Sequence, residues 1–406
     1  MSFDIKFINH ACFQIVKDNF SILVDPWFSG RVFNNSWELL RETDIVKDNI
    51  DLSKLTHIFI SHEHPDHLSW KTLGQIRKHC KQDIEVLVPS RNNTNVLDNL
   101  VKMGFSARYC DPYKLHTVEK YDFSFLFLKN NFDSAIVFDI DEKIIFNKND
   151  CEFNESELTQ IKNNIFKNRK IDYLFNQFSL AGYYGNKEEV EKINLSKQKH
   201  VSDIILAHKI LQPDISIPFA SFIYFCRESN KYLNEYIVRP EELLSIEENI
   251  SFFIPYFYEN IPKSLNIEKS LINAEKWNKI FDEKISSKIE KTKSTSEEKI
   301  IDSFNRFCDS ISIEKNYKNL QVPNEIFSLY VIDLKRYCLI NFYEDKINFV
   351  DSIPNEEIAI VHSYDLDCFF KFPWGADTIN ITSCFSVKDM SSWKKLLTFK
   401  DFCYFR

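Results

Sequence analysis

Three histidines and one aspartate occur within six residues, in the segment Ser61-His-Glu-His-Pro-Asp-His-Leu68. His62 and His64 are separated by one residue, so both side chains can face one metal ion, while Asp66 and His67 turn toward a second position nearby. Imidazole and carboxylate together suit borderline metals such as zinc and iron, and a catalytic site keeps one coordination position open. The spacing therefore predicts a metal centre rather than unrelated surface histidines.

Short strands and helices are expected to hold this segment. An apolar strand over Leu55–Ile60 leads into it, and a helix over Ser69–Cys80 follows, with Ser69 as its N-cap. Further β-rich runs lie between residues 3 and 24, between 84 and 88, and between 123 and 146, with helical patterns inserted among them. This alternation predicts an α/β sandwich, in which two packed sheets carry helices on their outer faces.

The chain has 406 residues, which is long for one compact core, so more than one domain is expected. We predict a metal-binding domain over residues 1–263 and a charged helical connector over 264–305. A small α+β domain is predicted over 306–406, in which Phe372–Asp377 forms a packed turn.

Composition narrows the class of protein. Hydrophobic residues make up 44% and charged residues 27%, which is typical of globular proteins, and the net charge of −8 is dispersed and disfavours a nucleic-acid binder. No apolar run is long enough to cross a bilayer and no signal sequence is evident, which predicts a cytoplasmic protein. The ten cysteines include no Cys-x-x-Cys pair, so reduced, buried thiols are expected.

The cluster with its flanking strand and helix resembles the metallo-β-lactamase superfamily. Asn9-His10-Ala11-Cys12-Phe13 and the Asp25-Pro-Trp27 segment resemble the branch that contains ascorbate-phosphate lactonases and CMP-N-acetylneuraminate hydroxylase. Asn147-Lys-Asn-Asp150-Cys151 and Ile217-Pro-Phe-Ala220 resemble the hydroxylase in particular. The resemblance implies a metallo-β-lactamase-like αββα sandwich, followed here by the helical connector and the small α+β C-terminal domain.

The resemblance also implies a ligand set. Asp150 corresponds to the aspartate that bridges two metal positions, so His62, His64, Asp66, His67 and Asp150 are the expected ligands for one or two divalent ions, whether zinc, iron or manganese. Asp66 or Asp150 would orient the attacking water. His10 either contacts substrate or a ligand or is a buried histidine bonded to backbone, and Asp25 either accepts a hydrogen bond from a metal-bound histidine or forms a turn.

Two departures from the family pattern concern missing histidines. The segment Lys129-Asn130-Asn131-Phe132-Asp133 stands where relatives supply a third histidine, and Asn230 stands where the hydroxylase has another. Either one metal is held by His62, His64 and Asp150, or a side chain such as Asp133 or His208 replaces a missing ligand.

A third departure is that the Cys and His pairs of the hydroxylase's Rieske centre do not occur in the chain. Arg227 is a candidate to bind a substrate phosphate, and the alternative is that it forms an ordinary salt bridge within the protein.

Three functions follow as hypotheses. The first is a metal-dependent hydrolase acting on an ester, lactone, amide or phosphoester of an anionic small molecule. The second is a non-haem iron oxygenase or oxidase on a sugar nucleotide or related metabolite, with a separate reductase as electron donor. The third is a non-catalytic homologue that binds a ligand or partner. The sequence is compatible with a homo-oligomer in each case.

Overall fold

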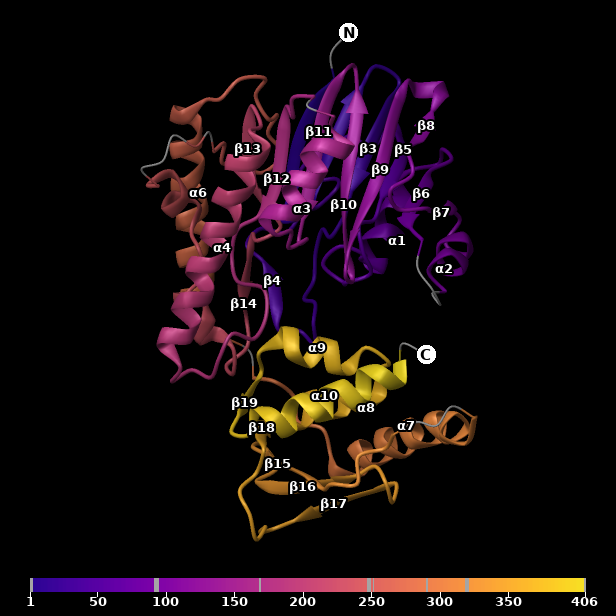
Figure 1. Cartoon of the computed structure of the whole chain (residues 1–406), viewed down its shortest axis with the longest axis vertical. Helices are drawn as coiled ribbons and strands as arrows, with labels where there is room; N and C mark the ends of the chain where they lie inside the picture. Colours follow the sequence, from indigo (N-terminus) through magenta and orange to yellow (C-terminus); the bar gives the residue numbers. More distant parts are fainter. Residues whose placement is uncertain are drawn as a thin grey trace.

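The computed structural model describes residues 3–90, 95–167, 169–246, 250, 252–289, 291–317 and 321–404. Its larger part is a sandwich of two six-stranded sheets, drawn in indigo to magenta in Figure 1. The first sheet has the order β1-β2-β3-β5-β6-β7, in which β1 to β3 are antiparallel and β3, β5, β6 and β7 are parallel. Its strands are β1 (Asp4–Asn9), β2 (Cys12–Lys17), β3 (Phe20–Val24), β5 (Leu55–Phe59), β6 (Glu85–Pro89) and β7 (Ser106–Cys110).

The second sheet has the order β13-β12-β11-β10-β9-β8. An antiparallel meander runs from β8 to β11, and β11, β12 and β13 are parallel. Its strands are β8 (His116–Val118), β9 (Phe123–Asn130), β10 (Asp133–Ile140), β11 (Lys143–Asn149), β12 (Tyr173–Gln177) and β13 (Ile215–Phe219). A separate two-stranded ribbon pairs β4 (Trp37–Leu39) with β14 (Ile223–Phe225).

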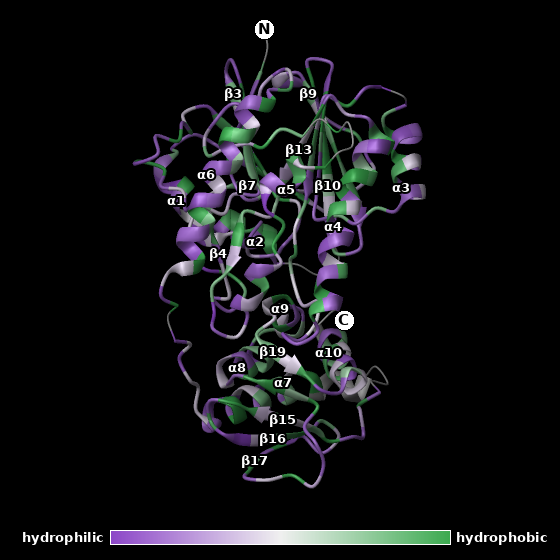
Figure 2. Cartoon of the chain, turned by 90° about the vertical axis from the view of Figure 1, so that its left-hand side faces the viewer, coloured by the Kyte–Doolittle hydropathy of each residue, from purple (hydrophilic) through white to green (hydrophobic). Residues whose placement is uncertain are grey.

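Phenylalanines fill the space between the two sheets. Phe13 of the first sheet stacks on Phe175 of the second at 4.4 Å between ring centroids, and Phe59 meets Phe138 edge to face at 4.7 Å. Both strand faces are apolar, since one face packs on the other sheet and the other face packs on helices. Figure 2 shows the hydrophobic residues concentrated in these strands.

Helices cover both outer faces, which confirms the predicted αββα sandwich. On the first sheet, α1 (Trp70–His79) and α2 (Val96–Lys102) bury Leu73, Ile76 and Leu100. On the second, α3 (Glu155–Gln160), the π-helical turn η2 (Ile161–Ile165) and α4 (Val190–Leu211) cover the strands. Shorter elements are η1 (Glu119–Tyr121), η3 (Lys231–Glu235) and α5 (Pro240–Leu244).

The predicted connector over 264–305 consists of helices, but they bury apolar residues in two different cores. Helix α6 (Ile267–Ser286) buries Trp277 and Phe281 in the core of the sandwich. Helix α7 (Glu297–Tyr317) buries Ile300 and Phe304 in the core of the C-terminal part. Among the side chains that the structure describes, the charged residues of both helices are exposed or half-buried. The division at 263 and 305 stays a prediction.

The C-terminal part has one five-stranded sheet and four helices among the described residues, drawn in orange and yellow in Figure 1. The sheet order is β17-β16-β15-β18-β19, with β15 (Phe327–Val331), β16 (Arg336–Asn341), β17 (Lys346–Val350), β18 (Ala359–Val361) and β19 (Phe385–Val387). The helices are α7, α8 (Ser363–Lys371), α9 (Gly375–Thr382) and α10 (Met390–Tyr404). The predicted turn at Phe372–Asp377 is wrong in part, because Gly375 to Asp377 form the first turn of α9.

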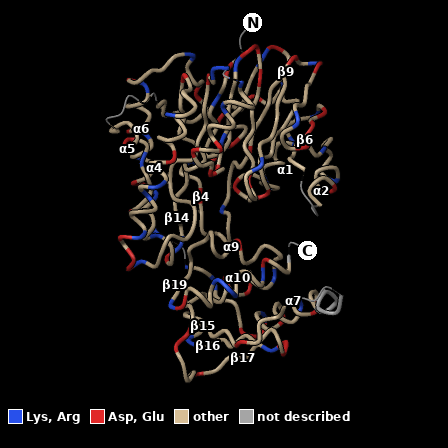
Figure 3. Tube along the Cα trace, in the orientation of Figure 1, with Lys and Arg blue, Asp and Glu red and all other residues tan. Residues whose placement is uncertain are grey.

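Charged residues of both signs are interspersed along the trace, as Figure 3 shows. In the described part of the chain, no helix is both long and apolar enough to cross a membrane. All ten cysteines lie in the described part of the chain and are in the thiol form, and nine of them are buried.

Candidate metal centre

The histidine segment lies in the loop between β5 and α1. The backbone turns tightly there, because His67 N and Leu68 N both donate to His64 O, at 3.0 and 2.7 Å. The predicted N-cap is present, since Ser69 Oγ accepts a hydrogen bond from Thr72 N at 3.3 Å and fixes the start of α1. The loop is thus held at both ends, by a buried strand and by a capped helix.

Other strand ends meet at the same edge of the sandwich. His10 follows β1, Asp25 follows β3 and Asp150 follows β11, while Asp133 begins β10. Strands β1, β3 and β5 run in one direction, so their carboxyl ends lie together, and the hairpins of the second sheet bring β10 and β11 to this edge. Carboxyl ends of parallel strands are a common place for ligand sites.

A first group of potential ligands consists of His62, His64 and Asp133, whose donor atoms all lie within 4.8 Å of one another. His62 Nε2 is 2.9 Å from His64 Nδ1 and 3.5 Å from Asp133 Oδ1. Next to Asp133, the hydroxyl of Ser134 donates to Ser61 O and ties β10 to the histidine loop. Asp133 therefore lies where the sequence left a third ligand open.

Two further groups adjoin the first. His62, His67 and Asp150 form one, with His67 Nε2 3.0 Å from Asp150 Oδ2. His10, Asp66 and His67 form the other, with Asp66 Oδ2 3.3 Å from His10 Nε2 and 3.4 Å from His67 Nε2. Because His62 and His67 are each shared by two groups, the donors form one continuous cluster with room for two neighbouring positions.

The buried polar atoms of this cluster fit a metal ion. Asp66 Oδ1, Asp150 Oδ1 and His10 Nδ1 are buried, and none of these three atoms has a hydrogen-bond partner in the protein. Burying such atoms without partners costs free energy, and buried charges in proteins are paired or coordinate metals. Carboxylate oxygens and imidazole nitrogens that converge in this way suit a divalent cation.

The charges of the cluster also favour a bound cation. Burial lowers the pKa of His67, but the negative charges of Asp66 and Asp150 outweigh it and hold that pKa well above its usual value. Burial raises the pKa of Asp66, but the charge of His67 and the hydrogen bond from His10 hold it well below its usual value. The carboxylate of Asp66 therefore stays ionised and attracts positive charge, which a divalent metal supplies in place of protons.

Asp25 holds the histidine loop from behind. Its carboxylate is fully buried and accepts hydrogen bonds from Ser61 N at 2.7 Å, Ser61 Oγ at 2.6 Å, Asn149 Nδ2 at 2.7 Å and His67 Nδ1 at 3.0 Å. The bond to His67 leaves the Nε2 of that ring facing Asp66 and Asp150. His10 and Asp25 both have positive φ, at +27° and +42°, which non-glycine residues rarely adopt.

The C-terminal part reaches the cluster through Asp377 of α9. Asp377 Oδ2 is 3.1 Å from His64 Nε2, across 313 residues of sequence. Burial lowers the pKa of His64, but the hydrogen bond and the charge of Asp377 outweigh it, and the net pKa is raised.

Asp377, Ser61 and Asn149 also contact the cluster, although the sequence did not mark them as site residues. Ser61 and Asn149 directly adjoin predicted ligands, which was an available signal, whereas no local pattern marks Asp377.

Some candidates lie outside the cluster. Arg227 was a candidate for a substrate phosphate, but its guanidinium is buried and pairs with both carboxylate oxygens of Asp365, at 2.6 and 2.8 Å. Asn230 Nδ2 donates to Ser36 O and Thr382 O, so this amide joins backbone segments. These two residues connect the sandwich to the C-terminal part and do not face the donor groups.

Two more candidates have local roles. Asn131 is exposed in the two-residue turn between β9 and β10, with φ +51°, a conformation that asparagine tolerates. His208 lies on α4, with Nδ1 2.8 Å from Ser216 Oγ. Neither belongs to a donor group among the described residues.

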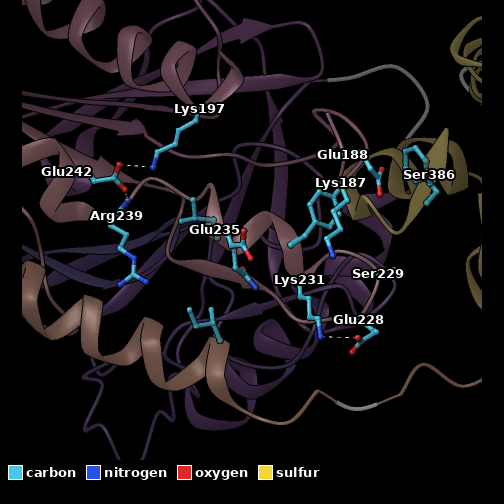
Figure 4. Close-up of a pocket in the computed structure, with 15 residues that line it drawn as sticks. Lys187, Glu188, Lys197, Glu228, Ser229, Lys231, Glu235, Arg239, Glu242 and Ser386 are labelled. Carbon is cyan, nitrogen blue, oxygen red and sulfur yellow. Dashed lines mark hydrogen bonds and ion pairs between the residues drawn. The ribbon is translucent and has the colours of Figure 1, made fainter. Parts of the chain in front are cut away.

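A surface hollow of about 750 Å³ lies elsewhere, between α4, η3 and β19, and is drawn in Figure 4. Four basic and four acidic side chains line it, and two pairs bridge it: Lys197 with Glu242 at 2.7 Å and Lys231 with Glu228 at 2.9 Å. No member of the metal cluster lines this hollow. The charges that line this hollow are balanced.

Comparison with known proteins identifies a domain that covers most of the strands of the sandwich. Residues 4–168 match the beta-lactamase superfamily domain. The chain thus carries a metallo-β-lactamase superfamily domain, and every candidate ligand from His10 to Asp150 lies within it.

Among curated proteins, the chain is 25% identical over 248 residues to the cytidine monophosphate-N-acetylneuraminic acid hydroxylase of Danio rerio, covering 57% of this chain and 40% of that protein. The Mus musculus protein of the same name is 25% identical over 249 residues, with 57% and 41% covered. The chain spans about two fifths of the length of these relatives.

Solved structures of low similarity include CmlA, a diiron β-hydroxylase from Streptomyces venezuelae, with 14% identity, a TM-score of 0.43 and coverage of 64% of this chain and 54% of that one. Another is the metallo-beta-lactamase fold protein YhfI from Bacillus subtilis, with 11% identity, a TM-score of 0.44 and coverage of 64% and 100%.

Proposed function

We propose that this chain is a metal-dependent hydrolase that holds two divalent ions at the histidine cluster. The observation that carries the proposal is the continuous set of donor groups that share His62 and His67. His62, His64 and Asp133 would hold the first ion, His10, Asp66 and His67 the second, and Asp150 would lie between them. Ions bound there supply a water of lowered pKa and polarise the bond under attack.

The residues of the chain divide the remaining work. Asp150 is the better candidate to orient the attacking water and take its proton, because its side chain is 17% exposed whereas that of Asp66 is 4% exposed. The phenyl ring of Phe132 lies 5.0 Å from the His64 ring, beside the proposed first position. The substrate class we favour is an anionic small molecule, in line with the acidic sugar nucleotide in the relatives' name.

The test is an activity screen of metal-loaded protein. Protein reconstituted separately with zinc, manganese and iron is assayed against ester, lactone, amide and phosphodiester panels. Asp150→Asn is expected to bind metal but to lose most of its turnover. The control is Asp214→Asn, at an exposed aspartate directly before β13, which should keep wild-type rates. Full metal loading with no hydrolysis of any panel would reject the hydrolase.

One observation favours an oxygenase as the second candidate. In the first donor group, two imidazoles stand with the carboxylate of Asp133, and two histidines with one carboxylate are typical of non-haem iron sites. The curated relatives are hydroxylases by name. Such an enzyme would need a separate reductase. Oxygen uptake by anaerobically iron-loaded protein, given a reductant and a panel of sugar nucleotides, distinguishes the two candidates.

A further inference from the structure

The contact between His64 and Asp377 joins two separately built parts of the chain. His64 Nδ1 faces His62 Nε2 at 2.9 Å, within the first donor group, while His64 Nε2 faces Asp377 Oδ2 at 3.1 Å. A neutral imidazole has one N–H donor and one acceptor nitrogen. When Nε2–H of His64 donates a hydrogen bond to Asp377, the ring keeps its proton on Nε2. The lone pair of Nδ1 is then available to the first metal position.

The helix that carries Asp377 is fixed at both of its ends. At its start, Gly375 packs directly on the α8 backbone, where a Cβ would overlap the carbonyl of Phe369. At its end, Thr382 O accepts a hydrogen bond from Asn230 Nδ2 at 2.8 Å. Figure 1 shows α9 as the C-terminal helix nearest the sandwich.

Buried contacts between the two parts hold this arrangement. The Arg227–Asp365 pair is shielded from solvent, with side chains 4% and 0% exposed, and links the end of β14 to α8. The loop before β4 also reaches α8, where Asn35 Nδ2 donates to the Tyr364 hydroxyl at 3.0 Å. The neighbouring Phe33 ring lies 5.8 Å from the His64 ring, so this loop contacts both α8 and the metal cluster.

We propose that the C-terminal part completes the metal centre, with Asp377 as a positioning residue that fixes the tautomer and orientation of His64 for the first metal position. The inference rests on the two-metal site proposed above. Each position then has one histidine backed by a carboxylate: Asp25 backs His67 from within the sandwich, and Asp377 backs His64 from outside it. Carboxylates in this role orient the ring and raise its basicity as a ligand.

Loss of Asp377 should weaken the first position and spare the second. The substitution Asp377→Asn keeps the shape and an acceptor oxygen but removes the charge. Loss of an outer carboxylate typically lowers metal affinity about 10- to 100-fold, and the lower end is expected here because Asp377 is 41% exposed. His67 keeps its bond to Asp25, so the second position should bind as in the wild type.

The experiment titrates the full-length apoprotein with Co²⁺ and follows its visible absorption, together with metal content after dialysis. The expected result is one weakened and one unchanged binding step in Asp377→Asn, with the apoprotein melting temperature unchanged. Asp377→Glu should recover much of the loss. The double variant Asp377→Asn/Asn380→Asp is the matched control, because it restores the net charge on the same helix without a carboxylate beside His64, and it should stay as weak as Asp377→Asn.

Three outcomes would overturn the inference. Wild-type affinity at both positions in Asp377→Asn would show that His64 needs no support. Equal weakening of both positions with a lowered melting temperature would show that Asp377 acts only on domain packing, and full recovery in the double variant would show that only the net charge of α9 matters. If the wild type itself binds no Co²⁺ at the cluster, the proposed two-metal function fails, and the inference fails with it. This outcome is read from the wild type alone, so it is distinct from any result obtained with the variants.

Discussion

Asp25 offers a direct test of how the site is supported, through the substitution Asp25→Asn. The side chain is fully buried, and three donors converge on its Oδ2: Ser61 Oγ, Asn149 Nδ2 and His67 Nδ1. An asparagine amide has one acceptor oxygen in place of two, so with that oxygen toward these three donors the bond from Ser61 N is lost, and the three remaining bonds lose their charge. The backbone at φ +42° is as favourable for asparagine as for aspartate, so the change isolates the hydrogen bonds.

The magnitude follows from the bonds lost. A hydrogen bond to a charged group contributes about 1.5–3 kcal/mol and one to a neutral group about 0.5–1.5 kcal/mol, so one lost bond and three bonds without the charge should together lower the free energy of unfolding by about 3–6 kcal/mol. The loss of the carboxylate charge behind the His67 ring should in addition weaken the second metal position by about 10- to 100-fold. The two effects are separable, since the first is measured on apoprotein and the second by metal titration.

The assay compares urea unfolding of apoprotein with Co²⁺ titration in the wild type, Asp25→Asn and Asp172→Asn. Asp172 is the matched control, because it is also buried and bonded to Ile144 N at 2.9 Å and Lys143 Nζ at 2.7 Å, but it lies at the opposite end of β11. Asp172→Asn should lose stability without losing metal affinity. The reasoning is refuted if Asp25→Asn binds both ions like the wild type, or if both variants lose the same affinity.

Four further predictions concern other parts of the molecule. His10→Ala should weaken the second metal position by about 10-fold or more, and an unchanged binding stoichiometry and affinity by metal analysis would contradict the assignment of His10 as a ligand. Asp133→His should shift metal selection from iron toward zinc in a competition measured by elemental analysis; an unchanged ratio would mean that Asp133 does not bind. Burial lowers the pKa of His200 from 6.5 to about 4, so between these pH values the unfolded chain binds more protons than the folded one. The free energy of unfolding should therefore fall by up to about 3 kcal/mol as the pH drops from 6.5 to 4. Urea unfolding of His200→Gln should show a weaker pH dependence than the wild type, and an equal dependence would contradict this. Gly375→Ala should destabilise the C-terminal part by about 1–3 kcal/mol, because its Cβ overlaps the Phe369 carbonyl, and an unchanged melting temperature would contradict the close packing.

The order of the polar residues after β5 is enough to predict that four potential metal ligands lie together. His62, His64, Asp66 and His67 lie within one turn of chain, and a strand and a capped helix fix that turn locally. Their proximity is therefore a property of the sequence itself. The sandwich was predictable for a related reason, since apolar runs of strand length that alternate with helices have few ways to bury both strand faces.

Tertiary structure decided how the cluster is completed and supported. His10, Asp25, Asp133 and Asp150 come from four other strand ends, and only the pairing of the two sheets brings them to one edge. The same holds for Arg227, which local sequence left open as a substrate contact and which Asp365 neutralises in the fold.

Asp377 is the extreme case, because its contact with His64 spans 313 residues and depends on how α9 packs on α8 and on Asn230. Residue type and spacing determine which side chains can bind a metal near one another in the chain. The contacts between distant segments determine which carboxylates reach them, because that choice depends on packing energies that no short stretch of sequence contains.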